Sequence, residues 1–235
     1  MDWNQVITRN QPLLLTIVSE MYAMLRTVDV GPGVEGKSGS FTLPRRVLNA
    51  ILFLLRPAES AVRRLILIAA RGIVLKPGAS QPFPVSLTFR VKTGITRAPI
   101  FQLIDPLKDF GPEAYDNNPD PAPASGFTAP FDPFEAHRLA LIGDQPVNAT
   151  LIYNRLRALR LALNDLPRQA RRLARWNAKR DLALKAKGPW RPIRISIFRP
   201  GPPPGYRRKD IHQIDSILKD LHYFAVEADN AVNST

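Results

Sequence analysis

Apolar residues recur at helical spacing through the first third of the chain. The pattern predicts a helix over residues 11–24, with Pro12 in its first turn. Two further apolar helices are expected over 44–56 and 58–76, separated by Pro57, because a proline inside a helix removes a hydrogen bond and crowds the preceding turn. They could form a hairpin or a kinked rod. The second of them is apolar around most of its circumference, interrupted mainly by Arg64 and Arg71. This favours the centre of a core, and the alternatives are an oligomer interface or a membrane-surface contact.

Helical periodicity is absent between residues 77 and 130. Two short strands are expected there, SLTFRV at 86–91 and PIFQLI at 99–104, and the stretch 117–129 has the composition of an exposed loop. The sequence DPFE at 132–135 is typical of a helix N-terminus, and that helix should end near Gly143.

The most regular pattern lies between residues 148 and 187, where Asn148 is expected to cap a long helical stretch. Apolar residues alternate at spacings of four and three across Pro167: Ile152, Leu156, Leu159, Leu163, Leu166, Ala170 and Leu173. Such a heptad seam predicts one kinked rod, or two helices that pack the same face on one core. The seam 152–173 also offers a surface for a protein partner or for self-association.

The last part of the chain combines a proline-rich stretch with a helix. Six prolines between 188 and 206 predict an extended brace, in which alternating isoleucines at 193, 195 and 197 suggest a short edge strand. A closing helix is expected over 210–229, with an apolar face formed by Ile211, Ile214, Leu218, Leu221 and Ala225.

These elements predict a mainly α protein, with a helical core, a minor β or irregular portion and long proline-rich loops. Residues 1–80 would form an apolar helical segment, 81–131 an irregular proline-rich segment, and 132–235 a basic helical segment. The last includes the brace at 188–209 and the closing helix. We expect one folded unit.

Charge is distributed unevenly along the chain. The net charge is +13, from 33 basic and 20 acidic residues. Residues 148–209 alone hold 17 basic and 2 acidic residues, and the flanking segments 81–147 and 210–235 are acidic. A strongly basic segment favours nucleic acid or another polyanion as partner, although the acidic flanks could fold back and mask it.

The basic segment has an ordered pattern. Arg168, Arg172, Arg175 and Lys179 fall on the face opposite the seam, with Arg171 at its edge. The positive charge continues into Arg207, Arg208 and Lys209, and Trp176, Trp190 and Tyr206 are interleaved with it. Phosphates of a duplex or anionic headgroups would fit this row, and an ordinary solvated face is the alternative. No helix-turn-helix, zinc-finger or RNP-like signature accompanies it, so any contact with nucleic acid should be made to the backbone.

A phosphate-binding loop is also matched by spacing. Gly31, Gly36, Lys37 and Ser38 fit the pattern G-x-x-x-x-G-K-[ST], and Asp105 follows an apolar run as a partner acid would. However, Gly39 and Pro44 disfavour the helix that should start at the lysine, and few strands are available for a parallel sheet. A flexible linker is the preferred interpretation, and nucleotide binding is the enzymatic alternative.

No other catalytic pattern is present. Cysteine is absent, which excludes disulfides and thiol nucleophiles. His212, Asp215 and His222 lie near one face of the closing helix, but Lys219 stands in the same row and would repel a cation. We therefore expect no cofactor and no metal.

The sequence predicts a non-enzymatic, cytoplasmic basic protein that binds nucleic acid through phosphate contacts. The alternative is a scaffold or assembly protein that acts through helix–helix contacts or at an anionic membrane surface. No transmembrane span is expected, because the apolar stretches are too short or carry charges. The arginine-bearing stretch 62–75 could still make a peripheral membrane contact.

Overall fold

A computed structural model describes residues 2–27, 41–73, 98–106, 146–185 and 196–233. Its helices are α1 (Trp3–Thr27), α2 (Arg45–Ala70), α5 (Thr150–Asn164), α6 (Leu166–Lys185) and α7 (Gln213–Asn233). Strands β1 (Thr42–Pro44) and β2 (Pro146–Asn148) pair antiparallel, with Leu43 opposite Val147. The mainly α class with a minor β portion is thus confirmed.

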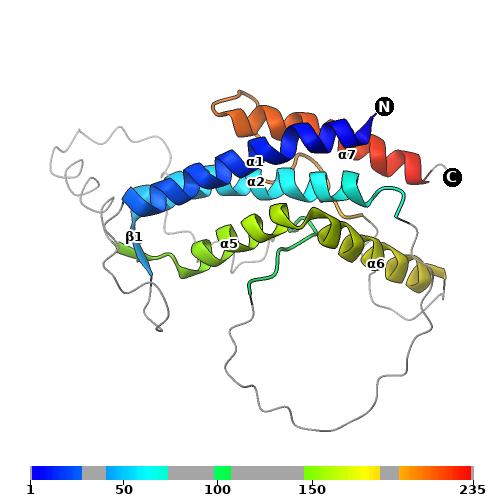
Figure 1. Ribbon diagram of the computed structural model, residues 1–235, viewed down its shortest axis with the longest axis horizontal. Coiled ribbons are helices and arrows are strands. Elements are labelled where there is room, and N and C mark those ends of the chain that lie inside the picture. Colours follow the sequence, from blue (N-terminus) through cyan, green and yellow to red (C-terminus); the bar gives the residue numbers. More distant parts are fainter. Residues whose placement is uncertain (1, 28–40, 74–97, 107–145, 186–195, 234–235) are drawn as a thin grey trace, which may run out of the picture.

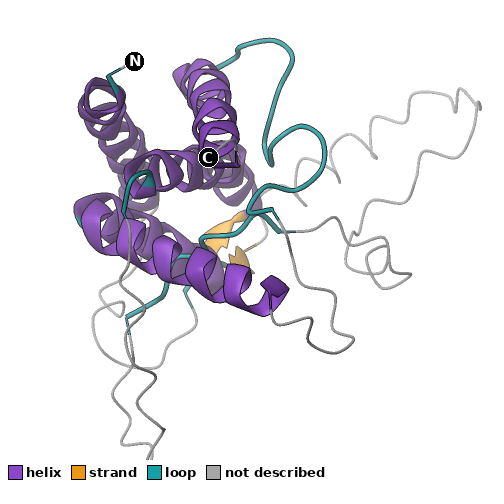
Figure 2. Ribbon diagram, turned by 90° about the vertical axis from the view of Figure 1, so that its right-hand side faces the viewer, coloured by secondary structure: helices purple, strands orange, loops and turns teal. Residues whose placement is uncertain are grey.

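Helix α2 lies in the middle of the structure. It packs against α1 and α7 on one side and against α5 and α6 on the other (Figure 1), and Figure 2 shows the helices gathered in one group with the short strands beside them. Ala61, Val62, Leu65 and Ile66 have no exposed surface. The expectation that this apolar stretch is the centre of a core is confirmed.

Of the two arrangements expected at Pro57, the hairpin is wrong and the rod is the one found, because α2 continues through this residue as one helix. Proline has no N–H to donate to the carbonyl of Phe53, one turn earlier. The guanidinium of Arg207 supplies a donor instead, with Nη2 at 2.6 Å from that oxygen. The same guanidinium lies 3.3 Å from the centroid of the Phe53 ring and pairs with Asp215 at 2.9 Å. A side chain far along the chain therefore compensates the hydrogen bond that Pro57 removes.

The heptad seam is divided between two helices, as one of the two interpretations held. The chain breaks at Asp165, whose Oδ1 accepts a hydrogen bond from the Arg168 N–H at 3.2 Å, and Pro167 falls in the first turn of α6. Every seam residue is buried: Ile152, Leu156, Leu159, Leu163, Leu166, Ala170 and Leu173. The seam therefore serves the fold of the chain itself. Self-association through it stays a prediction, and it would require these residues to leave the core.

Other element boundaries differ from the expectations. Helix α1 begins eight residues earlier than predicted, and Pro12 lies inside it. Residues 98–106 contain no strand, because their polar backbone is held by arginine side chains rather than by a neighbouring strand. Helix α7 begins at Gln213, so Ile211 lies before it and is 69% exposed. Ile197 is buried without belonging to a strand.

Several expectations lie outside the described residues. These are the strand at 86–91, the loop at 117–129, the helix at 132–143, most of the brace at 188–195, and the loop at 31–38. Within the described part of the chain, no helix combines the length and apolar character needed to cross a membrane.

Candidate functional site

Two arginines of α2 are buried in the core beside one carboxylate. Arg63 and Arg64 are 4% and 1% exposed, and Asp105 is 1% exposed. Arg63 Nη1 lies 3.1 Å from Asp105 Oδ1, and Arg64 Nη2 lies 3.0 Å from Oδ2. Because a buried charge is costly unless it is paired and hydrogen-bonded, this shared carboxylate is what allows both guanidiniums to stay inside.

The arginine pair also organises the segment 98–106, which has no regular secondary structure. Arg63 Nε donates to the carbonyl of Gln102 at 3.0 Å, and Arg172 Nη1 donates to that of Phe101 at 2.7 Å. The N–H of Asp105 donates to the carbonyl of Ile197 at 3.1 Å. The network therefore joins α2, α6 and two loop segments that are far apart in the sequence.

The remaining donors of Arg64 are also satisfied. Its Nη1 contacts the carbonyl and the hydroxyl of Ser60, both at 2.8 Å, and its Nε donates to Nδ1 of His222 at 3.2 Å. Burial and the charge of Arg64 lower the pKa of His222. The imidazole is therefore held neutral, with an unprotonated Nδ1 as acceptor and its proton on the other nitrogen.

A second carboxylate, Glu59, lies one turn before Arg63 at the edge of the network. Arg155 of α5 binds it with two hydrogen bonds, of 2.9 Å and 2.8 Å, and Arg63 Nη2 lies 3.4 Å from Oε2. The hydrogen bond with Glu59 raises the pKa of Arg155. Glu59 thereby ties α5 to α2.

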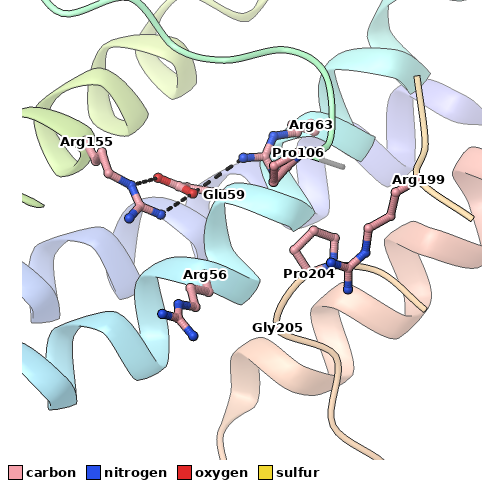
Figure 3. Close-up of a pocket in the computed structure, with 8 residues that line it drawn as sticks. All are labelled: Arg56, Glu59, Arg63, Pro106, Arg155, Arg199, Pro204 and Gly205. Carbon is pink, nitrogen blue, oxygen red and sulfur yellow. Dashed lines mark hydrogen bonds and ion pairs between the residues drawn. The ribbon is translucent and has the colours of Figure 1, made fainter. Parts of the chain in front are cut away.

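A pocket of about 390 Å³ opens next to Glu59. Its walls come from α2, α5, the end of the segment 98–106 and the segment 199–205, and the residues that form them are Arg56, Glu59, Arg63, Pro106, Arg155, Arg199, Pro204 and Gly205 (Figure 3). We call this the arginine pocket. Four guanidiniums against one carboxylate give its walls a net charge of +3.

The basic residues predicted on the third quarter of the chain lie in two different environments. Arg171, Arg175 and Lys179 are exposed on α6, and within the described residues they have no ion-pair partner. Arg168 is 82% exposed and lies 4.0 Å from Asp165. Arg172 is half-buried and braces Phe101, so it points away from this group. We call Arg168, Arg171, Arg175 and Lys179 the α6 row.

The predicted continuation of the row at residues 207–209 is placed apart from it, beside α2 and α7. Arg207 is engaged with Phe53 and Asp215, whereas Arg208 and Lys209 are exposed. The carbonyl of Arg208 accepts a hydrogen bond from Lys219 at 3.0 Å. Through its contacts with Phe53 and Asp215, Arg207 has a structural role.

The nucleotide-loop residues Gly31, Gly36, Lys37 and Ser38 lie outside the described residues. The acid proposed as their partner, Asp105, is enclosed between Arg63 and Arg64. Both of its carboxylate oxygens are already engaged by these guanidiniums.

His212, which precedes α7, and Asp215 in its first turn have structural partners. Asp215 Oδ2 accepts hydrogen bonds from the N–H groups of Ile211 and His212, each at 3.1 Å, while His212 Nδ1 accepts one from the N–H of Ile214. This reciprocal arrangement is a capping box with histidine as the cap residue. No group of three or more potential metal ligands occurs among the residues that the structure describes.

Comparisons with known protein families, curated proteins and solved structures found no match to this chain.

Sequence reasoning missed the arginine pair and the pocket. One signal was present, since two adjacent arginines interrupt an otherwise apolar helix and a lone acid follows the apolar run 99–104. A buried arginine needs a carboxylate partner, so these features could have been combined. The contribution of Arg155 and Arg199 had no comparable signal, because both belong to the strongly basic segment 148–209, in which nothing distinguishes them from the other arginines.

Proposed function

We propose that the protein is a non-enzymatic binder of nucleic acid, which it contacts through backbone phosphates with the α6 row. The observation that carries this proposal is that Arg171, Arg175 and Lys179 are exposed on one face and have no ion-pair partner in the described structure. At a rise of about 1.5 Å per residue, the row extends over roughly 16 Å of helix. Unpaired cations at this spacing suit a line of phosphates.

The packing of α6 favours phosphates of nucleic acid over a membrane surface. A helix that lies on a membrane buries its apolar face among the lipids. The apolar residues Leu166, Ala170 and Leu173 of α6 are instead buried in the core, where the helix packs against α2. Leu182, at 63%, is the large apolar side chain that α6 exposes among its described residues.

The proposed contact reads no bases. It consists of guanidinium and ammonium groups on a convex helix face, which position a protein on a duplex without sequence information. We therefore expect similar affinity for duplexes of different sequence.

Salt titration of duplex binding tests the proposal. Fluorescence anisotropy with a labelled duplex of about 25 base pairs should give a linear fall of log affinity with log salt, with a slope of about −3.6 if four phosphates are neutralised. The variant R171Q/R175Q should reduce the magnitude of that slope by about 1.8.

The matched control is R9Q/R26Q, which removes the same charge from exposed positions of α1. It should leave the slope close to that of the unmodified protein. Equal effects of the two double variants would mean that only net charge matters, and no binding at low salt would remove the proposal altogether.

A further inference from the structure

We propose that the arginine pocket is a second, separate anion site, and that it binds a small phosphorylated molecule carrying two or more negative charges. None of its lining residues belongs to α6, so the proposal does not depend on the α6 row. Its volume of about 390 Å³ lies within the range of small-molecule sites, which begins at roughly 300 Å³.

Within the described part of the chain, the positive charges of the pocket are not balanced by neighbouring carboxylates. Arg63 and Arg155 share Glu59, and Arg63 also binds Asp105. Arg56 and Arg199 have no carboxylate partner among the described residues. Burial lowers the pKa of Arg64, and the positive charges of Arg63 and Arg199 lower it further. A bound anion would supply the negative charge that the walls lack.

The two unpaired guanidiniums belong to different walls. Arg56 projects from α2, near Arg155 of α5, and Arg199 belongs to the opposite segment with Pro204 and Gly205 (Figure 3). Arginine binds phosphate and carboxylate with paired N–H donors. A planar carboxylate presents one such edge, whereas a tetrahedral phosphoryl group offers oxygens in several directions. Donors from separate walls therefore suit phosphate better.

The wall that carries Arg199 is fixed in place. Gly205 has a φ of +80°, and a Cβ added there would lie 2.5 Å from the nitrogen of Pro57. Only glycine permits this approach, so the segment rests directly on α2. Arg199 Nε donates to the carbonyl of Pro202 at 3.0 Å, which orients the guanidinium. Groups held in position before binding lose little entropy when the ligand arrives.

Calorimetric titration of the full chain with inorganic pyrophosphate, in a low-salt buffer without phosphate, tests the proposal. We expect binding of one pyrophosphate per chain. The variant R56Q/R199Q should weaken it by about tenfold or more for each guanidinium removed. The pyrophosphate affinity of R56Q alone is a second test. Arg56 is exposed, so its loss should not affect folding.

Three comparisons make the result decisive. R9Q/R26Q, with the same loss of charge, and R171Q/R175Q, which impairs the α6 row, should both bind pyrophosphate as the unmodified protein does. Citrate, a carboxylate of comparable charge, should bind clearly more weakly. No pyrophosphate binding at millimolar concentration, or equal binding by R56Q, R56Q/R199Q and the unmodified protein, would overturn the site. Equal affinity for citrate would overturn its assignment to phosphate.

Discussion

Arginines of two helices have opposite surroundings in this molecule. On α2, Arg63 and Arg64 are almost completely buried and bind Asp105. On α6, Arg171 and Arg175 are exposed, with no ion-pair partner among the described residues. The first pair holds the fold together, and the second pair is available to a ligand. The net charge counts all four arginines alike. It therefore overstates the positive charge that is exposed at the surface and could attract a polyanion.

The difference follows from the energetics of charge burial. A guanidinium in a core must recover its lost hydration through hydrogen bonds and an opposite charge. Removal of the partner then leaves the desolvated charge uncompensated. An exposed guanidinium keeps its hydration, so its removal changes stability little. The four predictions that follow use this contrast and run from the largest expected effect to the smallest.

Asp105→Ala should be the most destabilising change. It leaves both buried guanidiniums without their shared carboxylate, and we expect a loss of about 3–5 kcal/mol in the free energy of unfolding. Chemical denaturation measures it. The matched control is Asp181→Ala, which removes an exposed carboxylate of α6 and should cost less than about 1 kcal/mol. Similar losses in the two variants would refute the distinction between the helices.

Arg207→Ala should be the next most destabilising. It removes the donor to the Phe53 carbonyl and the ion pair with Asp215, and should cost about 2–3 kcal/mol. In a Pro57→Ala background, residue 57 regains an N–H for the same carbonyl, so the cost should be smaller. A double-mutant cycle measures this coupling, and strict additivity would show that Arg207 does not compensate for Pro57.

Acid should weaken the fold through His222. Its pKa is lowered in the folded protein by burial and by Arg64, so the unfolded chain binds the proton more readily. Stability from this group is therefore complete above the ordinary pKa of 6.5 and falls as the pH drops below that value. His222→Gln keeps an acceptor without titrating. Unfolding measured between about pH 7 and pH 5 should show a shallower loss in the variant, and parallel profiles would exclude this role.

R171Q/R175Q should have the smallest effect on stability, within about 0.5 kcal/mol of the unmodified protein. The two side chains are exposed. Thermal unfolding checks this, and a large loss would mean that the α6 row supports the fold. The result also validates the duplex-binding experiment, since altered binding can then be assigned to lost contacts.

The sequence predicted the helices better than the contacts between them. The seam from Ile152 to Leu173 could be recognised because period and burial are local properties of a helix. Arg64 and Asp105 meet although they lie 41 residues apart, and the acid belongs to a segment without periodicity. Nothing in the local pattern indicates such a pairing.

Pro57 is a second case in which contacts with distant residues could not be predicted from the local sequence. The local rule that proline interrupts a helix left a hairpin and a kinked rod open, and it could not foresee the donor from Arg207 and the close approach of Gly205 at this point of a continuous α2. For the candidate sites, the exposed face of α6 was predictable from spacing, apart from Arg172, whose partner Phe101 is distant in sequence. The arginine pocket was not predictable, because its walls come from segments that only the fold brings together.

The contact between Phe53 and Arg207 also has a consequence for synthesis of the chain. These residues are 154 positions apart, so at ordinary elongation rates the donor leaves the ribosome on the order of ten seconds after the acceptor. Throughout that interval the carbonyl of Phe53 must be satisfied by water, and the turn before Pro57 is the weakest point of a nascent α2. The hydrogen bonding of α2 is thus completed only after Arg207, in the last third of the chain, has been made.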